Sequence, residues 1–453
     1  LLDDAIATPD ADFPWAYDET TLQTEAGRWT KAGAMALKAR ILQFAASPLF
    51  NDSQGYYGGT SEAEQKRLVW YGEYKPEYWT RFKEACKAFI DKLSTDGGYS
   101  LVQADGTRPQ DYRLAYRTAY FDEGSSEIIH SVHWLNKPNS QYVWYSWMGH
   151  NRTVYSVTQE YVEMFPWSDG TPFDWDKAET EGKLNQMFIK GDSVEGKALL
   201  QNVLLTRDPR LYETAIVNGT PSTLDWTTAA MTGNPYETWV GGSTSNNNSV
   251  DEQYGFATSY RNMKYSFGEY SGHGLQWATI RLSDVYLMYA EALIQTNTSG
   301  NFKDAIEWID KVRARVGMKG LVECNPDKDL LHNKELLMQE LFRERACELG
   351  FENARYMDMV RYKMKSTFEK PLHGLRIYRM VKNPTTGKFE RCNLQWYKAS
   401  KGQTFTCSDG TKVKIAYKDG IQQPTVFEYE KFELNKGKRK WWTQGFDPKW
   451  YLT

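Results

Sequence analysis

A long apolar segment near residue 280 restricts the folds open to this chain more than any other feature. From Ile280 to Ile294, apolar residues lie almost all the way round a helical projection rather than along one stripe. A helix of that kind has to be covered on every side by other elements. The sequence therefore predicts a central, buried helix with partners packed around it.

The segments that follow supply such partners. Residues 302–316 carry one apolar stripe at helical spacing, and Gly317 is placed to end that helix. Asn333 is placed to cap the next helix, because its side chain can accept a hydrogen bond from a backbone N–H in the first turn. We therefore expect helix pairs at about 279–317 and 333–365.

A further helix pair is predicted at about 28–94. Between Arg28 and Pro48, apolar residues recur three and four positions apart, and Pro76 suits the first turn of a second helix. Helix–turn–helix units of this spacing are typical of tetratricopeptide repeats, which stack in pairs to bury a shared face. An unspecific α-helical bundle predicts the same stripes, and periodicity does not separate the two.

The rest of the chain is less regular. Residues from about 99 to 278 are rich in loops, with one predicted strand at 127–134 and a stretch of Gly, Ser, Asn and Thr at 218–259. Long loops in compact domains are usually functional or disordered. At about 375–434 the hydrophobic period changes to two, which predicts a block of β-hairpins.

Charge and composition exclude several classes of function. Lys and Arg total 55 against 58 Asp and Glu, which gives a net charge of −3 and no electrostatic argument for a nucleic-acid partner. No apolar run approaches the ~18 residues of a membrane-spanning helix. The five cysteines form no Cys-x-x-Cys pair and no His-Glu-x-x-His set is present, so we expect neither a metal nor a cofactor.

One segment dense in charge could be taken for an active site. On a helix, Arg345 and Glu348 would be partners three residues apart, as would Arg355 and Asp358. A catalytic general acid needs surroundings that raise its pKa, and here every carboxylate has an arginine nearby. We interpret the segment as an ion-pair network and expect no catalytic residue. The charged residues are Glu344, Glu348, Glu352 and Asp358, with Arg343, Arg345, Arg355 and Arg361.

Four stretches, taken in order along the chain, resemble a known family. They are Gly27 to Arg40 with Ala46 to Asn51, Arg207 to Tyr212, Ile280 to Leu293, and Glu344 to Tyr362, which reads ERxxELxFExxRxxDxxRY. This set is similar to the SusD/RagB family of glycan-binding outer-membrane lipoproteins. The sequence departs from the family pattern at Asn353, where the family has Gly, and at Ala354, where it has His.

The resemblance implies a single domain over residues 1–453 that is mainly α-helical. It would be a right-handed, tetratricopeptide-like superhelix with irregular loops on one face, to which the sequence adds a small β-hairpin insertion near the C-terminus. The resemblance also implies a place on the outer membrane at the bacterial cell surface, held by a lipid anchor that lies outside this chain. There the protein would capture an oligosaccharide or polysaccharide and deliver it to a SusC-like, TonB-dependent transporter.

Aromatic side chains give the strongest signal for a binding site. Trp, Tyr and Phe make up 15% of the chain, and many lie in predicted loops. A sugar ring has an apolar C–H face that stacks on Trp or Tyr, while its hydroxyls take hydrogen bonds from polar side chains. We expect at least two of the following candidates to line one ligand site: Tyr57, Trp70, Trp144, Trp147, Arg152, Trp226, Trp239 and Tyr254.

Two other functions fit parts of the pattern. A glycoside hydrolase on a helical scaffold would also carry Trp-rich loops, but it needs two opposed carboxyls in an aromatic cleft, and no spacing in the sequence points to such a pair. A peptide-binding member of the same family is the second alternative. A scaffold that only binds a protein peptide would leave its aromatic rings in cores, with none facing an open groove.

Overall fold

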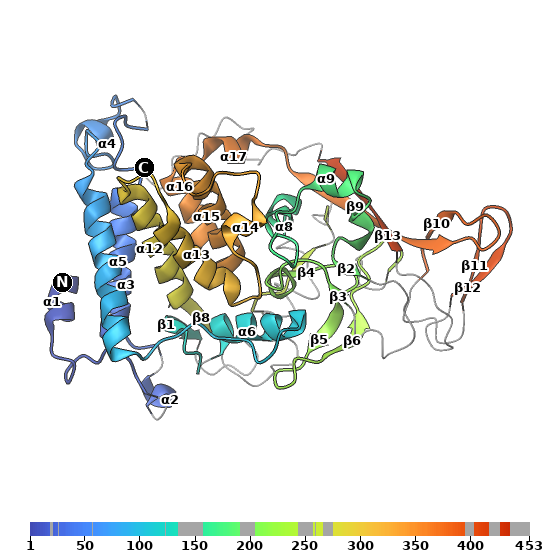
Figure 1. Cartoon of the computed structure of the whole chain (residues 1–453), viewed down its shortest axis with the longest axis horizontal. Helices are drawn as coiled ribbons and strands as arrows, with labels where there is room; N and C mark the ends of the chain where they lie inside the picture. The colour runs from blue at the N-terminus through green and yellow to red at the C-terminus, as the bar shows by residue number, and fades with distance from the viewer. Residues whose placement is uncertain are drawn as a thin grey trace.

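The fold is a group of packed helices joined to a region of short elements and small antiparallel sheets (Figure 1). The computed structural model describes residues 1–18, 21–25, 27–56, 58–122, 124–134, 157–190, 204–242, 257–258, 260–265, 275–394, 403–415 and 426–434. Helices gather toward the N-terminal side of Figure 1, and the C-terminal strands lie at the opposite end. The expectation of a mainly α-helical fold with a small β-hairpin block near the C-terminus is confirmed.

The first helix pair consists of α3 (Lys31–Ala46) and α5 (Glu77–Asp96), as the apolar stripes predict. Small buried residues of α3, such as Ala36 and Ala39, pack in one cluster with the large rings of Trp79 and Phe82 from α5. Small side chains on one helix leave room for aromatic ones on the other. Thr30 caps α3, because its Oγ1 accepts a hydrogen bond of 3.1 Å from the Gly33 N–H.

Helix α12 (Leu282–Thr296) is the central helix that the apolar segment predicts. It packs against α3 and α5 on one side and against α13 (Lys303–Ala314) and α15 (Lys334–Glu348) on the other. The helix starts later than the sequence suggests. Strand β8 (Leu275–Arg281) runs directly into it, so that Arg281 is both the last residue of the strand and the N-cap residue of the helix.

The loop-rich middle contains one substantial helix that the sequence pattern did not predict. Helix α6 (Pro109–Phe121) begins with Pro109 at its first position and with the carboxylate of Asp111 accepting a 2.9 Å hydrogen bond from the Arg108 N–H. It is largely buried. Strand β1 (Ile128–Trp134), which the sequence does predict, pairs antiparallel with β8 to form a two-stranded ribbon.

At the C-terminal end, β9 (His373–Lys382) and β10 (Phe389–Cys392) form the first predicted hairpin, and β11 (Gln403–Thr406) and β12 (Lys412–Ile415) form the second. A further strand inside the predicted hairpin block, β13 (Val426–Glu433), pairs with β9 and completes a sheet in the order β10-β9-β13. Alternate residues of this sheet, including Ile377 and Phe427, join the core of the middle region.

The remaining elements are short. They are α1 (Leu2–Ala7), α2 (Leu22–Glu25), α4 (Glu62–Gln65), α8 (Gln159–Met164), α9 (Trp175–Thr180), α11 (Leu211–Thr214), α14 (Leu321–Cys324), α16 (Ala354–Arg361), α17 (Lys365–Glu369), the 3-10 turn η2 (Leu184–Gln186), and the strands β2 (Ile189–Lys190), β3 (Leu204–Leu205), β4 (Ala215–Ile216), β5 (Pro221–Leu224), β6 (Met231–Pro235) and β7 (Arg261–Asn262).

Candidate functional site

The charged segment of α15 lies inside the protein, where it forms ion pairs with distant parts of the chain. Glu348 is fully buried, and Arg210 and Arg281 approach its carboxylate to 3.0 Å and 2.9 Å. Arg315 binds the same carboxylate. Burial alone would raise the pKa of Glu348, but the three guanidinium groups hold it well below its usual range. Glu348 is therefore an ionised structural group, not a proton donor.

A second set of ion pairs ties α12, α15 and α16 together. Arg345 Nε lies 2.7 Å from Asp358, and its Nη1 lies 3.0 Å from Asp284 on α12. Burial acts to raise the pKa of Asp358, yet Arg345 and Arg361 keep it below its ordinary value. The expectation of a structural network agrees with these contacts. The specific prediction that Arg345 pairs with Glu348 along the helix is wrong, because both residues are buried and reach partners on other elements.

Lys264 adds a buried cation to the same network. Its Nζ lies 2.6 Å from Glu352 and 2.8 Å from the hydroxyl of Tyr116, and the side chain is fully buried. Burial lowers the pKa of Lys264 to about 8, although the Glu352 carboxylate opposes the shift.

Two of the predicted ligand-binding rings lie apart from one another and from any shared site. Trp239 is fully buried and packs at 5.4 Å from the ring of Phe427, so it offers no surface to a ligand. Trp70 is partly buried in the first loop, where its Nε1 donates a 2.9 Å hydrogen bond to the Asp52 carbonyl. The positions of Tyr57, Trp144, Trp147, Arg152 and Tyr254 lie outside the described residues.

Trp226 lies in an aromatic cluster that also includes Trp277, a residue missed in the sequence. Trp226 is in the turn between β5 and β6, with its ring 6.0 Å from that of Phe121 and with Arg117 4.9 Å from its centroid. Trp277, on β8, stacks on Tyr265 at 4.8 Å and an interplanar angle of 16°. Both tryptophans are only partly buried. We call Trp226, Phe121, Tyr265 and Trp277 the Trp226–Trp277 cluster.

The β1–β8 ribbon has two chemically different faces. Val132 lies opposite Trp277 in the antiparallel register, so these two apolar side chains share one face. His133 lies opposite Gln276, and together with Ser131 these residues occupy the other face. Gln276 and Ala278, on either side of Trp277 along the strand, are buried, so the alternation of the strand places Trp277 on the opposite face.

The polar face of the ribbon lines a cavity of about 330 Å³, which we call the polar cavity. Its walls include Gly27, Tyr99, Ser126, Ser131, His133 and Gln276. The Trp29 ring, 42% exposed, stacks on His130 at 3.8 Å beside it. Burial lowers the pKa of His130, so this imidazole is neutral at neutral pH.

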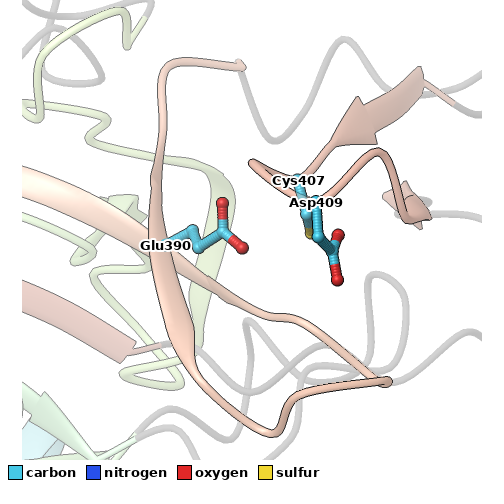
Figure 2. Close-up of side chains that lie close together, drawn as sticks. All are labelled: Glu390, Cys407 and Asp409. Carbon is cyan, nitrogen blue, oxygen red and sulfur yellow. The ribbon is translucent and has the colours of Figure 1, made fainter.

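One group of side chains has the composition of a metal site. Glu390 reaches from β10 toward the turn that carries Cys407 and Asp409 (Figure 2), and one potential ligand atom from each lies within 4.8 Å of the others. The Glu390 carboxylate already accepts a 2.7 Å hydrogen bond from the Ser408 N–H. Burial, followed by the two carboxylates, raises the pKa of the Cys407 thiol, whereas a metal binds the thiolate. We infer that this group stabilises the turn between β11 and β12.

Cys407 and Cys392 are free thiols buried in one apolar cluster.

The described part of the chain includes no helix with the length and apolar character needed to span a bilayer.

The comparisons with known proteins agree on one family. A model of the SusD family matches residues 114–417. Among solved structures, a SusD-like protein from Bacteroides fragilis shares 20% identity at a TM-score of 0.51, over 83% of this chain and 61% of that one. A protein named BT4246 shares 21% identity at a TM-score of 0.55, over 83% of this chain and 66% of that one. The chain thus spans less than two thirds of the length of each, and these similarities show a shared fold. No curated protein matches the sequence.

Proposed function

The chain belongs to the SusD family, and from this premise we propose that it is a cell-surface protein that captures an oligosaccharide or polysaccharide without cleaving it. It then delivers the glycan to a SusC-like, TonB-dependent transporter in the outer membrane. The cell surface, the lipid anchor and the transporter enter this proposal through the family resemblance. The proposal that the ligand is a glycan also has support from the residues of this chain, independent of the resemblance.

The Trp226–Trp277 cluster is the observation that supports a glycan as the ligand. Both tryptophans are partly exposed and pack on buried rings, Trp226 tilted against Phe121 and Trp277 stacked on Tyr265. The C–H face of a sugar can cover an exposed ring held in this way. Arg117 and the backbone around Asp225 fix Trp226, because the Asp225 carboxylate accepts hydrogen bonds from the N–H groups of Thr227 and Thr228. A ring that is fixed before binding loses little conformational entropy when the ligand arrives.

The state of three buried carboxylates in the ion-pair network supports binding without catalysis. Glycoside hydrolysis needs one carboxyl group with a raised pKa as general acid and a second one facing it across the sugar. Glu348, Asp284 and Asp358 each lie against at least two arginines, and their pKa values are lowered. These groups are ionised and paired with arginines, so they stabilise the fold and do not suit the role of a general acid.

The test is the intrinsic Trp fluorescence of the purified chain against a panel of soluble polysaccharides, with analysis of products in the same samples. Saturable quenching by one glycan without new reducing ends is the expected result. Quenching with cleavage would instead identify a glycoside hydrolase. If no glycan gives a saturable change, the glycan proposal fails and peptides become the next ligands to test.

A further inference from the structure

A second cavity lies between α8, α15, α16 and the segment that joins α17 to β9, and we call it the α8–α16 cavity. Its volume is about 610 Å³, well inside the range of roughly 300–1,000 Å³ that small-molecule sites occupy. Methionine side chains are flexible and polarisable, so a wall that contains them can pack against apolar ligands of different shapes. The apolar part of the wall includes Met164, Phe342, Met359, Met364, Pro371 and Leu372.

Five charged side chains also line the cavity, namely Glu160, Glu163, Arg343, Arg355 and Lys370. Both carboxylates are already engaged by residues outside it. Glu160 accepts a 2.8 Å hydrogen bond from the His373 N–H and lies 2.9 Å from the same residue's Nδ1. Glu163 lies 3.1 Å from Lys431 Nζ. The two acidic groups therefore do not neutralise the arginines and the lysine of the wall.

Arg343 is only partly compensated. Its Nη1 lies 3.4 Å from Glu340, but Lys328 holds the same carboxylate at 2.6 Å. One carboxylate thus faces two cations, and positive charge remains on this side of the cavity.

Arg355 is a half-buried charge that the fold leaves without a counterion. The prediction from sequence that it pairs with Asp358 is wrong, because Arg345 and Arg361 bind that carboxylate, each at 2.7 Å. The described residues give Arg355 neither an ion pair nor a hydrogen bond, and its nitrogen atoms are not sealed off from solvent. Burial lowers the pKa of Arg355, although Asp358 opposes the shift. A guanidinium nevertheless stays charged at physiological pH, and a buried charge is costly until it is paired.

These charges define the polar end of a ligand. Lys370 is exposed and, like Arg355, has no ion pair among the described residues. The planar fork of a guanidinium matches the two oxygens of a carboxylate. The carboxylates of Glu160 and Glu163 lie in the same wall and would repel a second negative charge. The complement of this cavity is therefore a molecule with one carboxylate and an apolar body.

We propose that the α8–α16 cavity binds a small monocarboxylic acid, whose carboxylate pairs with Arg355 and whose apolar body packs on Met359 and Met364. The lining shares no residue with the Trp226–Trp277 cluster, so this is a separate site. Neither the apolar wall nor the uncompensated charge depends on a glycan ligand. An incoming carboxylate would supply the counterion that the protein itself does not provide.

The experiment measures the binding of hexanoate by saturation-transfer NMR and by calorimetry. Hexanoate is expected to bind saturably, and added salt should weaken the binding. Hexanamide has the same apolar chain without the charge, and acetate has the charge without the chain. Both should bind at least about tenfold more weakly than hexanoate.

Arg355→Met removes the charge and keeps a long apolar side chain, and it should weaken hexanoate binding about tenfold or more. Because Arg355 has no partner to lose, the denaturation midpoint of this variant should not fall. A purely structural arginine would lower the midpoint when replaced and would leave the affinity for hexanoate unchanged.

Two further variants complete the test. Lys370→Glu, at an exposed position of the same wall, should weaken binding about threefold, and it keeps the test valid if Arg355→Met fails to fold. Arg81→Met is the matched control, because Arg81 is exposed on α5 and does not line the cavity. It removes one positive charge as well and should leave the affinity unchanged.

Several results would overturn the assignment. They are the absence of saturable hexanoate binding, equal affinity for hexanoate and hexanamide, and wild-type affinity in Arg355→Met, or in Lys370→Glu where the first variant does not fold. D-Glucuronate separates a sugar acid from an apolar acid, and tighter binding of D-glucuronate than of hexanoate would also contradict the proposal. None of these results bears on glycan capture, which the Trp fluorescence measurement tests by itself.

Discussion

Arg210 Nη1 lies 3.0 Å from Glu348 Oε2, although 138 residues separate the two in the sequence. The pair joins the short segment before α11 to the last turn of α15, and both side chains are fully buried. The same guanidinium also binds Asp208 and Glu344. The loop-rich middle of the chain is thus fastened to the helices by charge as well as by apolar packing.

Replacing Glu348 with Gln should destabilise the protein severely. The substitution keeps the shape and leaves Arg210, Arg281 and Arg315 with less negative charge to face. Removing one partner of a buried ion pair costs about 3–5 kcal/mol. Chemical denaturation followed by circular dichroism measures the loss. Glu323→Gln is the control, because Glu323 pairs with Lys319 at 2.8 Å on the surface and should cost less than about 1 kcal/mol. Equal losses in the two variants would contradict a structural role for the network.

Gly350→Ala should also lower stability, for a steric reason. A Cβ at Gly350 would overlap the hydroxyl oxygen of Tyr161, which is held in place by a 2.7 Å hydrogen bond to the Ala346 carbonyl. Overpacking of this kind costs about 1–3 kcal/mol. Gly124→Ala is the matched control, since a Cβ there meets nothing closer than 3.8 Å.

A double-mutant cycle isolates that contact. Tyr161→Phe removes the hydroxyl, so the cost of Gly350→Ala should be smaller in the Tyr161→Phe background than in the wild type. An unchanged cost would show that another neighbour causes the strain.

Lys264 should make stability rise with pH over one interval. Burial lowers its pKa to about 8 from an ordinary value of 10.5. Between these two values the unfolded chain holds a proton that the folded chain gives up, so a rise in pH favours the folded state. Relative to Lys264→Met, the wild type should gain on the order of 1–3 kcal/mol across that interval.

The comparison uses denaturation midpoints of both proteins at several pH values between about pH 8 and the ordinary lysine pKa. For Lys388→Met, at an exposed position, the plot of denaturation midpoint against pH should run parallel to that of the wild type. If the plot for Lys264→Met also runs parallel to that of the wild type, Lys264 does not titrate as its burial implies.

Trp226→Ala should weaken glycan binding if the proposed function is right. Loss of one stacking ring corresponds to about three- to tenfold in affinity. Trp226→Phe should retain part of the affinity because a smaller ring remains. Trp308→Ala is the control: this ring packs between Tyr286 and Tyr289 on the helices, and its loss should affect stability alone. Unchanged affinity in Trp226→Ala would remove the cluster from the binding site.

Regular helices and hairpins could be predicted because their signals are local. The stripe of α5 and the hairpin β9–β10 each lie within one stretch of sequence. The pairing of strand β13 with β9 could not be predicted in the same way, because its partner lies about fifty residues earlier. The pairing of Arg345 with Asp284 was missed for the same reason, since residue spacing reports only neighbours on one helix.

The candidate site was predictable only in part. Trp226 and Trp239 come from the same loop-rich stretch and look equivalent in the sequence, yet one is partly exposed and the other is fully buried. What separates them is the sheet β10-β9-β13: Phe427 of β13 packs against Trp239. Side-chain type indicates what a residue can bind, and only the tertiary fold decides whether the residue is accessible.

The junction between β8 and α12 limits how the length of this chain can change during evolution. Arg281 ends the strand and occupies the N-cap position of the helix, so no loop residue lies between the two elements. One inserted residue would turn α12 by about 100° and would reverse the face on which the preceding strand residues lie. By contrast, the turn at 297–301 is held by its own hydrogen bonds, such as that from Asn297 to the Asn301 carbonyl, and is largely exposed. Insertions and deletions among related chains should therefore accumulate in such turns and be excluded at the Arg281 junction.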